Sequence, residues 1–354
     1  MEIEKQKKKI FFFFKNKNNL LSKKLSTKRI KYDIFIDMKD TFSMIHDKKK
    51  NILIINGNHP SNFIKDGNIY KYINVSKIKK IRNGTSYTLL LTKDNKLFSF
   101  GDNENGQCGI DNIKYPIVHS PIEINFPFFT GENKIKDLYC FDKTSYILLK
   151  NNEVYFFGEK KNNYKPQKLI MNKNVDEIEK IIPSQSLSSF LFLTKTGKIY
   201  VDDLHIATIE KNNLKSFYNS YNNNIYILYE DNIIYEIDIY EYQQYQNKIF
   251  NIPIKIKGDI IKILYNISMY IILTTKGVYL FKHKVNHVLF GDIQNKNEKK
   301  FFRDKKIIDF ELTTSNAMAV SKNGIVYGWG YNDGVLRFSK NPEIYESPII
   351  LYKS

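Results

Sequence analysis

The sequence predicts an all-β fold built from seven copies of one unit. Each unit contains two short apolar runs joined by a tight polar turn, and the second run ends at a glycine in the best copies. The closing positions fall at residues 57, 101, 158, 203, 238, 282 and 330, at intervals of 35 to 57 residues. Short strands that repeat every 40 to 50 residues or so, without helical periodicity, are typical of a β-propeller, a ring of small radially packed sheets.

The clearest copy spans residues 78–110. Its apolar run at residues 87–91 is followed by a polar turn at residues 93–96 and a second run at residues 97–100, a pattern that predicts an antiparallel hairpin. Asparagine at the second half of this turn tolerates the positive φ that tight turns need. The turn position is occupied only by asparagine or glycine from this copy onward, at Asn95, Asn152, Gly197, Asn232, Gly277 and Gly324.

The repeat predicts one cooperative domain, because each sheet of such a ring is covered only by its neighbours. We expect a seven-bladed propeller over residues 33–354 and a short basic tail over residues 1–32. The blades are expected near residues 33–75, 76–127, 134–172, 176–210, 213–256, 259–303 and 306–354.

The end of the chain is expected to close the ring. Pro121, Pro166 and Pro253 each lead a short strand after a unit, and we expect these strands to feed the next blade. The last such strand, residues 348–351, has no following blade, and an exposed edge would invite aggregation. We therefore expect residues 348–351 to complete the first blade.

The loop after the clearest hairpin has a recognisable pattern. It runs Phe100-Gly101-Asp102-Asn103-Glu104-Asn105-Gly106-Gln107-Cys108-Gly109, which resembles the W-G-x-N-x-x-G-Q-L-G signature of the regulator of chromosome condensation repeat. A shorter copy follows Gly328, and the resemblance covers about residues 33–354 and implies a seven-bladed propeller. The residues at signature positions are Gly101, Asn103, Gly106, Gln107, Gly109, Gly158, Trp329, Gly330 and Asn332.

Three units depart from this signature. Where the family has an aromatic residue and a glycine, the fourth, fifth and sixth units have Asp202-Asp203, Ile237-Asp238 and Phe281-Lys282. Their loops are therefore not expected to follow the family pattern.

The charge is strongly basic and uneven. The formal net charge is +18, and residues 1–32 hold eleven lysines and arginines against Glu2 and Glu4. An AT-rich coding bias would also enrich lysine, so three interpretations of the tail stay open: a contact for nucleic acid or anionic lipid, an organellar targeting segment, or a solvated extension. The candidate polyanion contacts are Lys7, Lys8, Lys9, Lys23, Lys24, Lys28 and Arg29.

One insertion is rich in aromatic residues. Residues 111–131 include Phe126, Phe128 and Phe129, more than blade packing requires. An apolar patch on a loop is often an interface, but these side chains would equally serve to seal the ring.

The common catalytic and cofactor motifs are missing from the sequence. It has no phosphate-binding glycine loop and no nucleophile elbow, and His283 and His287 lie four apart in a strand-and-loop pattern without a third ligand. No apolar run is long enough to span a bilayer, and Cys108 and Cys140 form no disulfide framework. We expect a soluble intracellular protein without catalytic residues, cofactor or metal.

The resemblance bears on function as well. The founding member of the family exchanges nucleotide on a nuclear small GTPase and docks on nucleosomes, but the wedge that exchange requires has no counterpart after Gly158. We therefore predict a non-enzymatic protein-interaction scaffold, associated with chromatin or nucleic acid. Two alternatives stay open: a guanine nucleotide exchange factor for a Ran-type small GTPase, and an organellar RNA- or ribosome-associated factor.

These interpretations set the expected partners and compartment. We expect a monomer that binds an unknown protein on one propeller face, with nucleic acid or a nucleosome on the basic tail. The compartment expected is the nucleus or cytoplasm, with the mitochondrion as the alternative.

Overall fold

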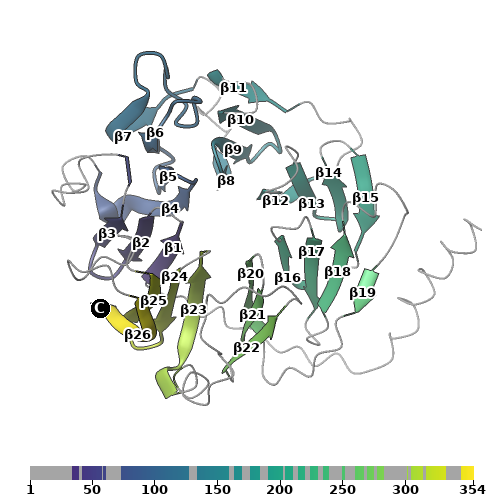
Figure 1. The fold of residues 1–354 in the computed structure, drawn as a ribbon. Coiled ribbons are helices and arrows are strands. Elements are labelled where there is room, and N and C mark those ends of the chain that lie inside the picture. The colour runs from purple at the N-terminus through teal and green to yellow at the C-terminus, as the bar shows by residue number, and fades with distance from the viewer. Residues whose placement is uncertain are drawn as a thin grey trace, which may run out of the picture.

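The fold is a ring of small antiparallel sheets (Figure 1). Within the residues described, 26 strands form five four-stranded and two three-stranded sheets. The computed structural model describes residues 34–39, 42–57, 59–60, 73–126, 134–158, 163–169, 176–183, 190–201, 204–209, 214–219, 224–229, 234–238, 249–251, 260–266, 269–274, 277–282, 301, 304–313, 316–331 and 344–354.

Each sheet is a meander, so consecutive strands are hydrogen-bonded neighbours. In chain order the sheets are β1 (Ile34–Met38), β2 (Phe42–Asp47) and β3 (Ile52–Gly57); β4 (Ile78–Asn83), β5 (Tyr87–Thr92), β6 (Leu97–Asp102) and β7 (Ile117–Ile124); β8 (Ile135–Phe141), β9 (Thr144–Leu149), β10 (Val154–Gly158) and β11 (Asn163–Lys168); β12 (Ile178–Pro183), β13 (Phe190–Thr194), β14 (Lys198–Val201) and β15 (Leu204–Thr208); β16 (Leu214–Asn219), β17 (Asn224–Tyr229), β18 (Ile234–Asp238) and β19 (Ile249–Asn251); β20 (Ile260–Asn266), β21 (Met269–Thr274) and β22 (Gly277–Lys282); and β23 (Ile307–Leu312), β24 (Asn316–Ser321), β25 (Ile325–Tyr331) and β26 (Ile344–Lys353).

The first strand of each sheet lies toward the middle of the ring (Figure 1). These inner strands contact one another from sheet to sheet, as β23 does with β1, β4 with β8, and β8 with β12. The second strands β2, β5, β9 and β24 are buried at every position. Their consecutive apolar residues are explained by this burial, because both faces of the sheet are covered by neighbouring sheets.

The predicted hairpins are confirmed where the structure describes them. Residues 87–91 pair with residues 97–101 in the register of β5 and β6, and the turn residues Asn95 and Asn152 have φ of 68° and 74°. Each of these two asparagines also links its sheet to the next one. Their Oδ1 atoms accept the backbone N–H of Ile135 (3.0 Å) and Ile178 (2.6 Å), the first residues of β8 and β12.

The expectation for the proline-led strands is wrong at three of the four positions, and Pro253 lies outside the described residues. Pro121, Pro166 and Pro348 lie in β7, β11 and β26, the outermost strands of their own sheets, and they do not feed the next sheet. Each lies where the pairing with the third strand shifts register. Proline lacks a backbone N–H, so an edge strand with an interrupted hydrogen-bond ladder tolerates it.

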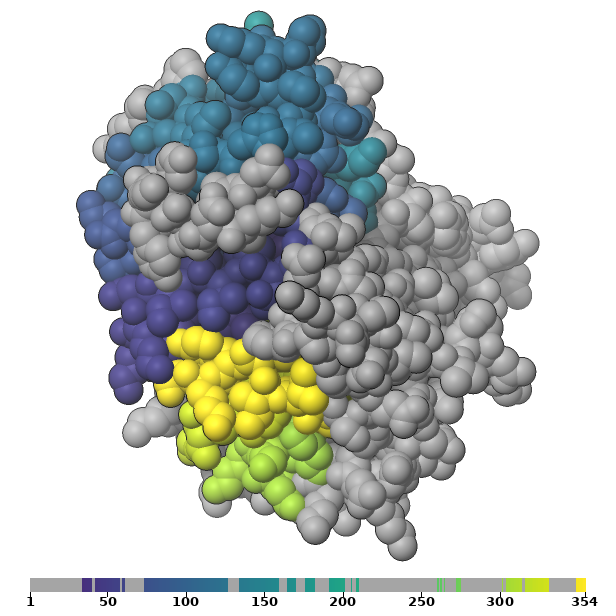
Figure 2. All heavy atoms as spheres, turned by 60° about the vertical axis from the view of Figure 1, so that its left-hand side comes forward, coloured from purple at the N-terminus to yellow at the C-terminus, as the bar shows by residue number. Residues whose placement is uncertain are grey.

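Residues 348–351 do not complete the first sheet. They belong to β26, which pairs with β25 in the last sheet. The first and last sheets nevertheless meet, because Ile36, Met318 and Leu351 lie in one apolar cluster and β1 contacts β23 and β24. Figure 2 shows the C-terminal residues in yellow directly beside the first sheet in purple.

The connections lie on two opposite faces of the ring. We call one of them the turn face. It holds the turns between second and third strands and the segments that enter each first strand. On this face, for example, Lys93 N donates to Lys77 O (2.8 Å). The loop face holds the turns between first and second strands and the loops between third and fourth strands. On that face Thr85 N donates to Asp142 O (3.1 Å) between neighbouring sheets.

No helix among the described residues is both long enough and apolar enough to cross a membrane.

Candidate functional site

The loop between β6 and β7 is organised by the buried side chain of Asn103. Its Nδ2 donates to Ile110 O (2.9 Å) and Tyr115 O (2.8 Å), and its Oδ1 accepts the N–H of Cys108 (2.9 Å). The backbone N–H of Asn103 donates to Pro116 O (2.8 Å). One fully buried amide therefore ties both ends of the loop together and gives it a defined shape.

Glycines shape the start of this loop and its counterparts. Gly101, Gly158 and Gly330 have φ of 113°, 113° and 117°, and the outer strand shifts register beside each of them. A Cβ on Gly101 would lie 2.5 Å from Ser86 O. The first glycine of the signature is thus required by a conformation and a close approach that side chains prevent.

Two further signature residues pack this loop against the next sheet. Gly109 has φ of 70°, and a Cβ there would lie 3.1 Å from the ring of Phe157. The backbone oxygen of Gln107 accepts the hydroxyl of Ser145 in β9 (2.7 Å), and its Oε1 accepts Asn105 N (2.9 Å). The remaining signature glycine, Gly106, adopts φ of 80° in the turn that its N–H closes on Asn103 O (2.9 Å).

The tip of the loop presents apolar side chains to solvent. Ile113 is 91% exposed, and Tyr115 and Ile117 are 39% and 37% exposed. The tip is held by Asp111, whose Oδ1 accepts Ile113 N (3.0 Å), and Lys114 Nζ lies 5.2 Å from the Tyr115 ring centroid. Because its tip exposes apolar side chains while its base is ordered by buried hydrogen bonds, this loop is a candidate interaction site.

The aromatic residues of the same insertion have a different place. Phe126 is half-buried and packs on Phe157 of the next sheet with ring centroids 6.0 Å apart. It therefore seals the contact between the second and third sheets. Phe128 and Phe129 lie outside the described residues.

The last signature copy is used for packing. Trp329 is buried and its ring lies 5.5 Å from that of Phe310 and 6.3 Å from that of Phe301. Asn332 lies outside the described residues, as do His283, His287 and the seven basic tail residues at positions 7–9, 23, 24, 28 and 29.

The inner strands form a second cluster of candidate residues, which the sequence analysis missed. In six of the seven, the pairing with the second strand shifts register by one residue at the same point. The residue after each shift is polar: Lys80, Asp137, Lys180, Ser216, Lys262 and Asp309. Aligning the strand before each hairpin would have found it, because the pattern of an apolar, any, polar and apolar residue recurs there.

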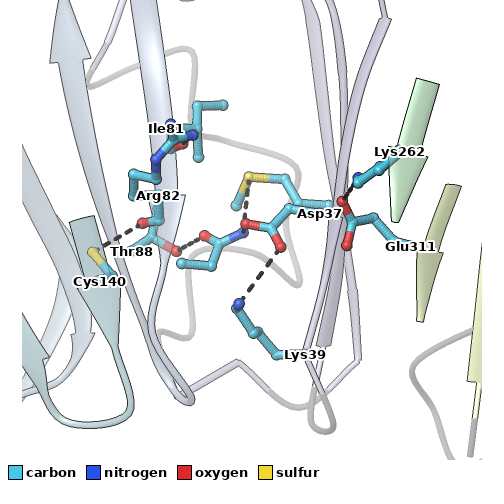
Figure 3. A network of polar contacts seen from close by, with 10 residues as sticks. Asp37, Lys39, Ile81, Arg82, Thr88, Cys140, Lys262 and Glu311 are labelled. Atoms are coloured by element: carbon cyan, nitrogen blue, oxygen red, sulfur yellow. Dashed lines mark hydrogen bonds and ion pairs between the residues drawn. The ribbon is translucent and has the colours of Figure 1, made fainter. Parts of the chain in front are cut away.

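Polar inner-strand residues bridge neighbouring sheets, and Figure 3 shows Asp37, Arg82 and the pair of Lys262 with Glu311 among them. Lys80 pairs with Asp137 of β8, and Arg82 Nε donates to Leu138 O (3.1 Å). On the other side, Asn83 Nδ2 donates to Asp37 Oδ2 of β1 (3.0 Å). These contacts join the first, second and third sheets close to the middle of the ring.

The last two sheets are joined by a half-buried lysine. Lys262 of β20 pairs with Asp309 (3.0 Å) and with Glu311 of β23. Burial opposes the charge of Lys262, but the two carboxylates outweigh it and raise its pKa. Burial raises the pKa of Glu311 to about 7; Lys262 opposes that shift, while Asp37 and Asp309 add to it. Glu311 therefore keeps its proton to a higher pH than an ordinary glutamate does.

Replacing Glu311 with glutamine is expected to alter how stability depends on pH. The folded pKa of about 7 lies above the unfolded value, so the folded chain binds more protons between pH 5 and 7 or so, and stability falls as pH rises through that range. The glutamine variant lacks this slope. Relative to the glutamine variant, the free energy of unfolding of the wild type should fall by on the order of 1 to 3 kcal/mol between about pH 5 and 8, measured by urea unfolding. An equal pH slope in both proteins would contradict this origin.

The two cysteines are not poised for chemistry. Burial raises the pKa of Cys140 to about 12 and that of Cys108 well above its ordinary value, so both thiols stay protonated. Cys108 Sγ donates to Asp102 O (3.3 Å) and Cys140 Sγ to Arg82 O (3.5 Å). Among the described residues, no group of three histidine, cysteine or acidic side chains is arranged to hold a metal ion.

Comparison with known proteins agrees with this geometry. Prp20p from Saccharomyces cerevisiae superposes with a TM-score of 0.60 at 18% identity, over 79% of this chain and 78% of that one. Human WBSCR16 gives 0.58 at 14% identity, over 77% and 82% of the two chains. The WD40 ectodomain of the Arabidopsis thaliana receptor kinase ACR4 gives 0.54 at 7% identity, over 89% and 99%. The chain is a β-propeller.

One of the repeated units matches a known repeat family. The model of the regulator of chromosome condensation (RCC1) repeat matches residues 78–107, which run from the start of β4 into the Asn103 loop. Mouse (Mus musculus) serine/threonine-protein kinase Nek9 is 31% identical over 81 residues, which are 23% of this chain and 8% of that kinase. Residues 78–107 of the chain are therefore an RCC1 repeat.

Proposed function

We propose that this RCC1-repeat propeller is a non-enzymatic scaffold that binds a protein partner on its loop face. The observation that carries the proposal is the β6–β7 loop, whose tip exposes Ile113, Tyr115 and Ile117 on a base ordered by Asn103. Four of the five large apolar side chains that are exposed among the described residues lie in residues 113–122. Such a concentration on one blade is characteristic of a contact surface.

The proposal includes the architecture that presents this loop. We infer that the seven sheets are the blades of one closed ring over residues 33–354, with residues 1–32 as a basic extension. Bonds between the first and last sheets support this inference: Tyr352 OH (2.9 Å) and Ser354 Oγ (2.6 Å) both donate to Asp47 Oδ2.

The partner contact is tested by replacing Ile113 with aspartate in the full-length tagged protein. A charge at a central apolar contact should reduce recovery of the bound partner by tenfold or more in affinity purification from the native organism. Ile350→Asp is the matched control, because Ile350 is 47% exposed but lies on the last sheet. Equal recovery with both variants would reject the loop as the docking site.

Nucleotide exchange is the second candidate function. Prp20p, whose structure was described together with its binding to Gsp1p and histones, is one of the superposing propellers. Release of labelled GDP from small GTPases, measured with and without the chain, separates this candidate from the scaffold. Accelerated release that persists in Ile113→Asp would favour exchange.

A further inference from the structure

The turn face concentrates lysine residues. In the described part of the chain, turns between second and third strands hold eight exposed lysines: three consecutive ones, Lys48 to Lys50, in the first sheet, and Lys93, Lys96, Lys150, Lys195 and Lys322 in later sheets. The segments that enter or end sheets on the same face add six more, at positions 77, 134, 168, 305, 306 and 353.

The described part of the opposite face is electrically balanced. Its described connections contain Lys39, Lys114 and Lys143 against Glu104, Asp111 and Asp142, three positive charges against three negative ones. Among the described residues the turn face has fourteen exposed lysines against six exposed or half-buried acidic residues, at positions 94, 123, 153, 176, 177 and 304. A coding bias toward lysine would enrich both faces alike, so it does not explain this asymmetry.

The fold holds these lysines in pairs. The first turn residue donates its backbone N–H to the segment that enters the same sheet, as Lys93 does to Lys77 O (2.8 Å), Lys150 to Lys134 O (2.9 Å) and Lys322 to Lys306 O (3.0 Å). Two lysines thus lie side by side in each of three sheets. Neighbouring like charges repel, and a bound anion removes that repulsion.

Few of these lysines have a counter-ion. Ion pairs join Lys96 to Glu123 (3.0 Å), Lys195 to Glu177 (2.6 Å) and Lys168 to Glu153. Within the described residues, the other eleven lysines of the turn face form no ion pair with a carboxylate. Their charge is therefore available to an external anion.

The composition of this face favours a phosphate backbone over a lipid or protein surface. None of the large apolar side chains that are exposed in the described residues lies in its turns, so nothing there would insert into a lipid interface. Protein interfaces are depleted in lysine and enriched in arginine and aromatic residues, and the described turns of this face expose neither. A phosphate backbone needs only regularly presented cations.

We propose that the turn face binds the phosphate backbone of nucleic acid through its lysine pairs, without reading base sequence. This site lies on the body of the propeller, opposite the loop face, and it is independent of the protein contact at Ile113. Because no exposed aromatic side chain is available for stacking in the described turns, we expect binding to depend on salt and little on sequence.

The experiment compares three full-length variants that each remove two positive charges. Lys150→Gln with Lys322→Gln breaks two lysine pairs, Lys114→Gln with Lys143→Gln changes the loop face, and Lys7→Gln with Lys8→Gln changes the tail. Binding to labelled duplex DNA and single-stranded RNA of about 20 nucleotides is followed by fluorescence anisotropy between about 50 and 200 mM salt. Thermal melts confirm that each variant is folded.

The turn-face variant should bind at least about tenfold more weakly and lower the magnitude of the salt slope by about 2, because each phosphate contact contributes about 0.9. The other two variants should change affinity less than about twofold. Equal loss in the loop-face variant, loss confined to the tail variant, or no binding by the wild type would overturn the proposal. Equally tight, equally lysine-dependent binding to phosphatidylserine vesicles would also overturn it, since it would mark general adsorption to anions.

Discussion

Gly158→Ala is expected to lower the free energy of unfolding by about 3 kcal/mol or more. Gly158 ends β10 with φ of 113°, a backbone conformation that L side chains rarely adopt. A Cβ placed there would lie 2.2 Å from Lys143 O and 3.1 Å from the Cα of Thr144. Both neighbours are backbone atoms of the hairpin between β8 and β9, so rotating a side chain cannot relieve the clash.

Gly109→Ala is the control for this prediction, and it is expected to have a smaller effect. Gly109 has φ of 70°, close to the left-handed region, and its nearest contact is the movable ring of Phe157 at 3.1 Å. We expect a loss of about 1 to 2 kcal/mol, measured like the first by chemical denaturation. Equal losses in the two variants would show that the close backbone approach at Gly158 is not what makes alanine costly there.

The hairpins could be predicted from sequence because their determinants are local. The apolar runs around Asn95 and Asn152 and the positive φ at both turns follow from residue type and spacing alone. The link that each asparagine makes to the next sheet could not be predicted in this way. The Oδ1 atoms of the two asparagines accept the backbone N–H groups of Ile135 and Ile178, which lie too far along the chain for a local pattern to encode the contact.

The prolines show how a correct pattern leads to a wrong topology. Pro121, Pro166 and Pro348 do mark strands, but a strand after a hairpin can extend its own sheet or begin the next one. The missing N–H favours an outer edge, and the bulged register beside Gly101, Gly158 and Gly330 provides it. The glycine and the proline therefore lie on the two sides of the same register shift between the third and fourth strands.

The candidate site was only partly predictable. Asn103 is in the signature, and its role as the amide that closes the loop follows only from its three side-chain hydrogen bonds. The sequence pointed to Phe126, Phe128 and Phe129; Phe126 is half-buried and the other two lie outside the described residues. The exposed apolar residues that the structure describes in this insertion are Ile113, Tyr115 and Ile117. A side chain's exposure depends on which neighbouring sheet covers it, as Phe157 covers Phe126.

Deletion of residues 348–354 is expected to destabilise the whole ring, although the strand does not complete the first sheet. The deletion removes the pairing of Ile349 and Ile350 with β25 and the buried side chain of Leu351. It also removes both hydroxyls that bond Asp47 in the first sheet. The lost burial and hydrogen bonds amount to roughly 5 kcal/mol, which corresponds to a fall in Tm of about 5 to 10 °C.

The shape of the melting curve tests whether the contact between the first and last sheets, which we call the seam, makes the ring unfold as one unit. If the first and last sheets support each other through Asp47 and Leu351, the truncated protein should still unfold in one transition at the lower Tm, followed by circular dichroism. Ile350→Ala, on the exposed side of the same strand, should shift Tm by less than about 2 °C. An unchanged Tm, or an added early transition, would mean that the last sheet melts alone and that the seam does not couple the ring.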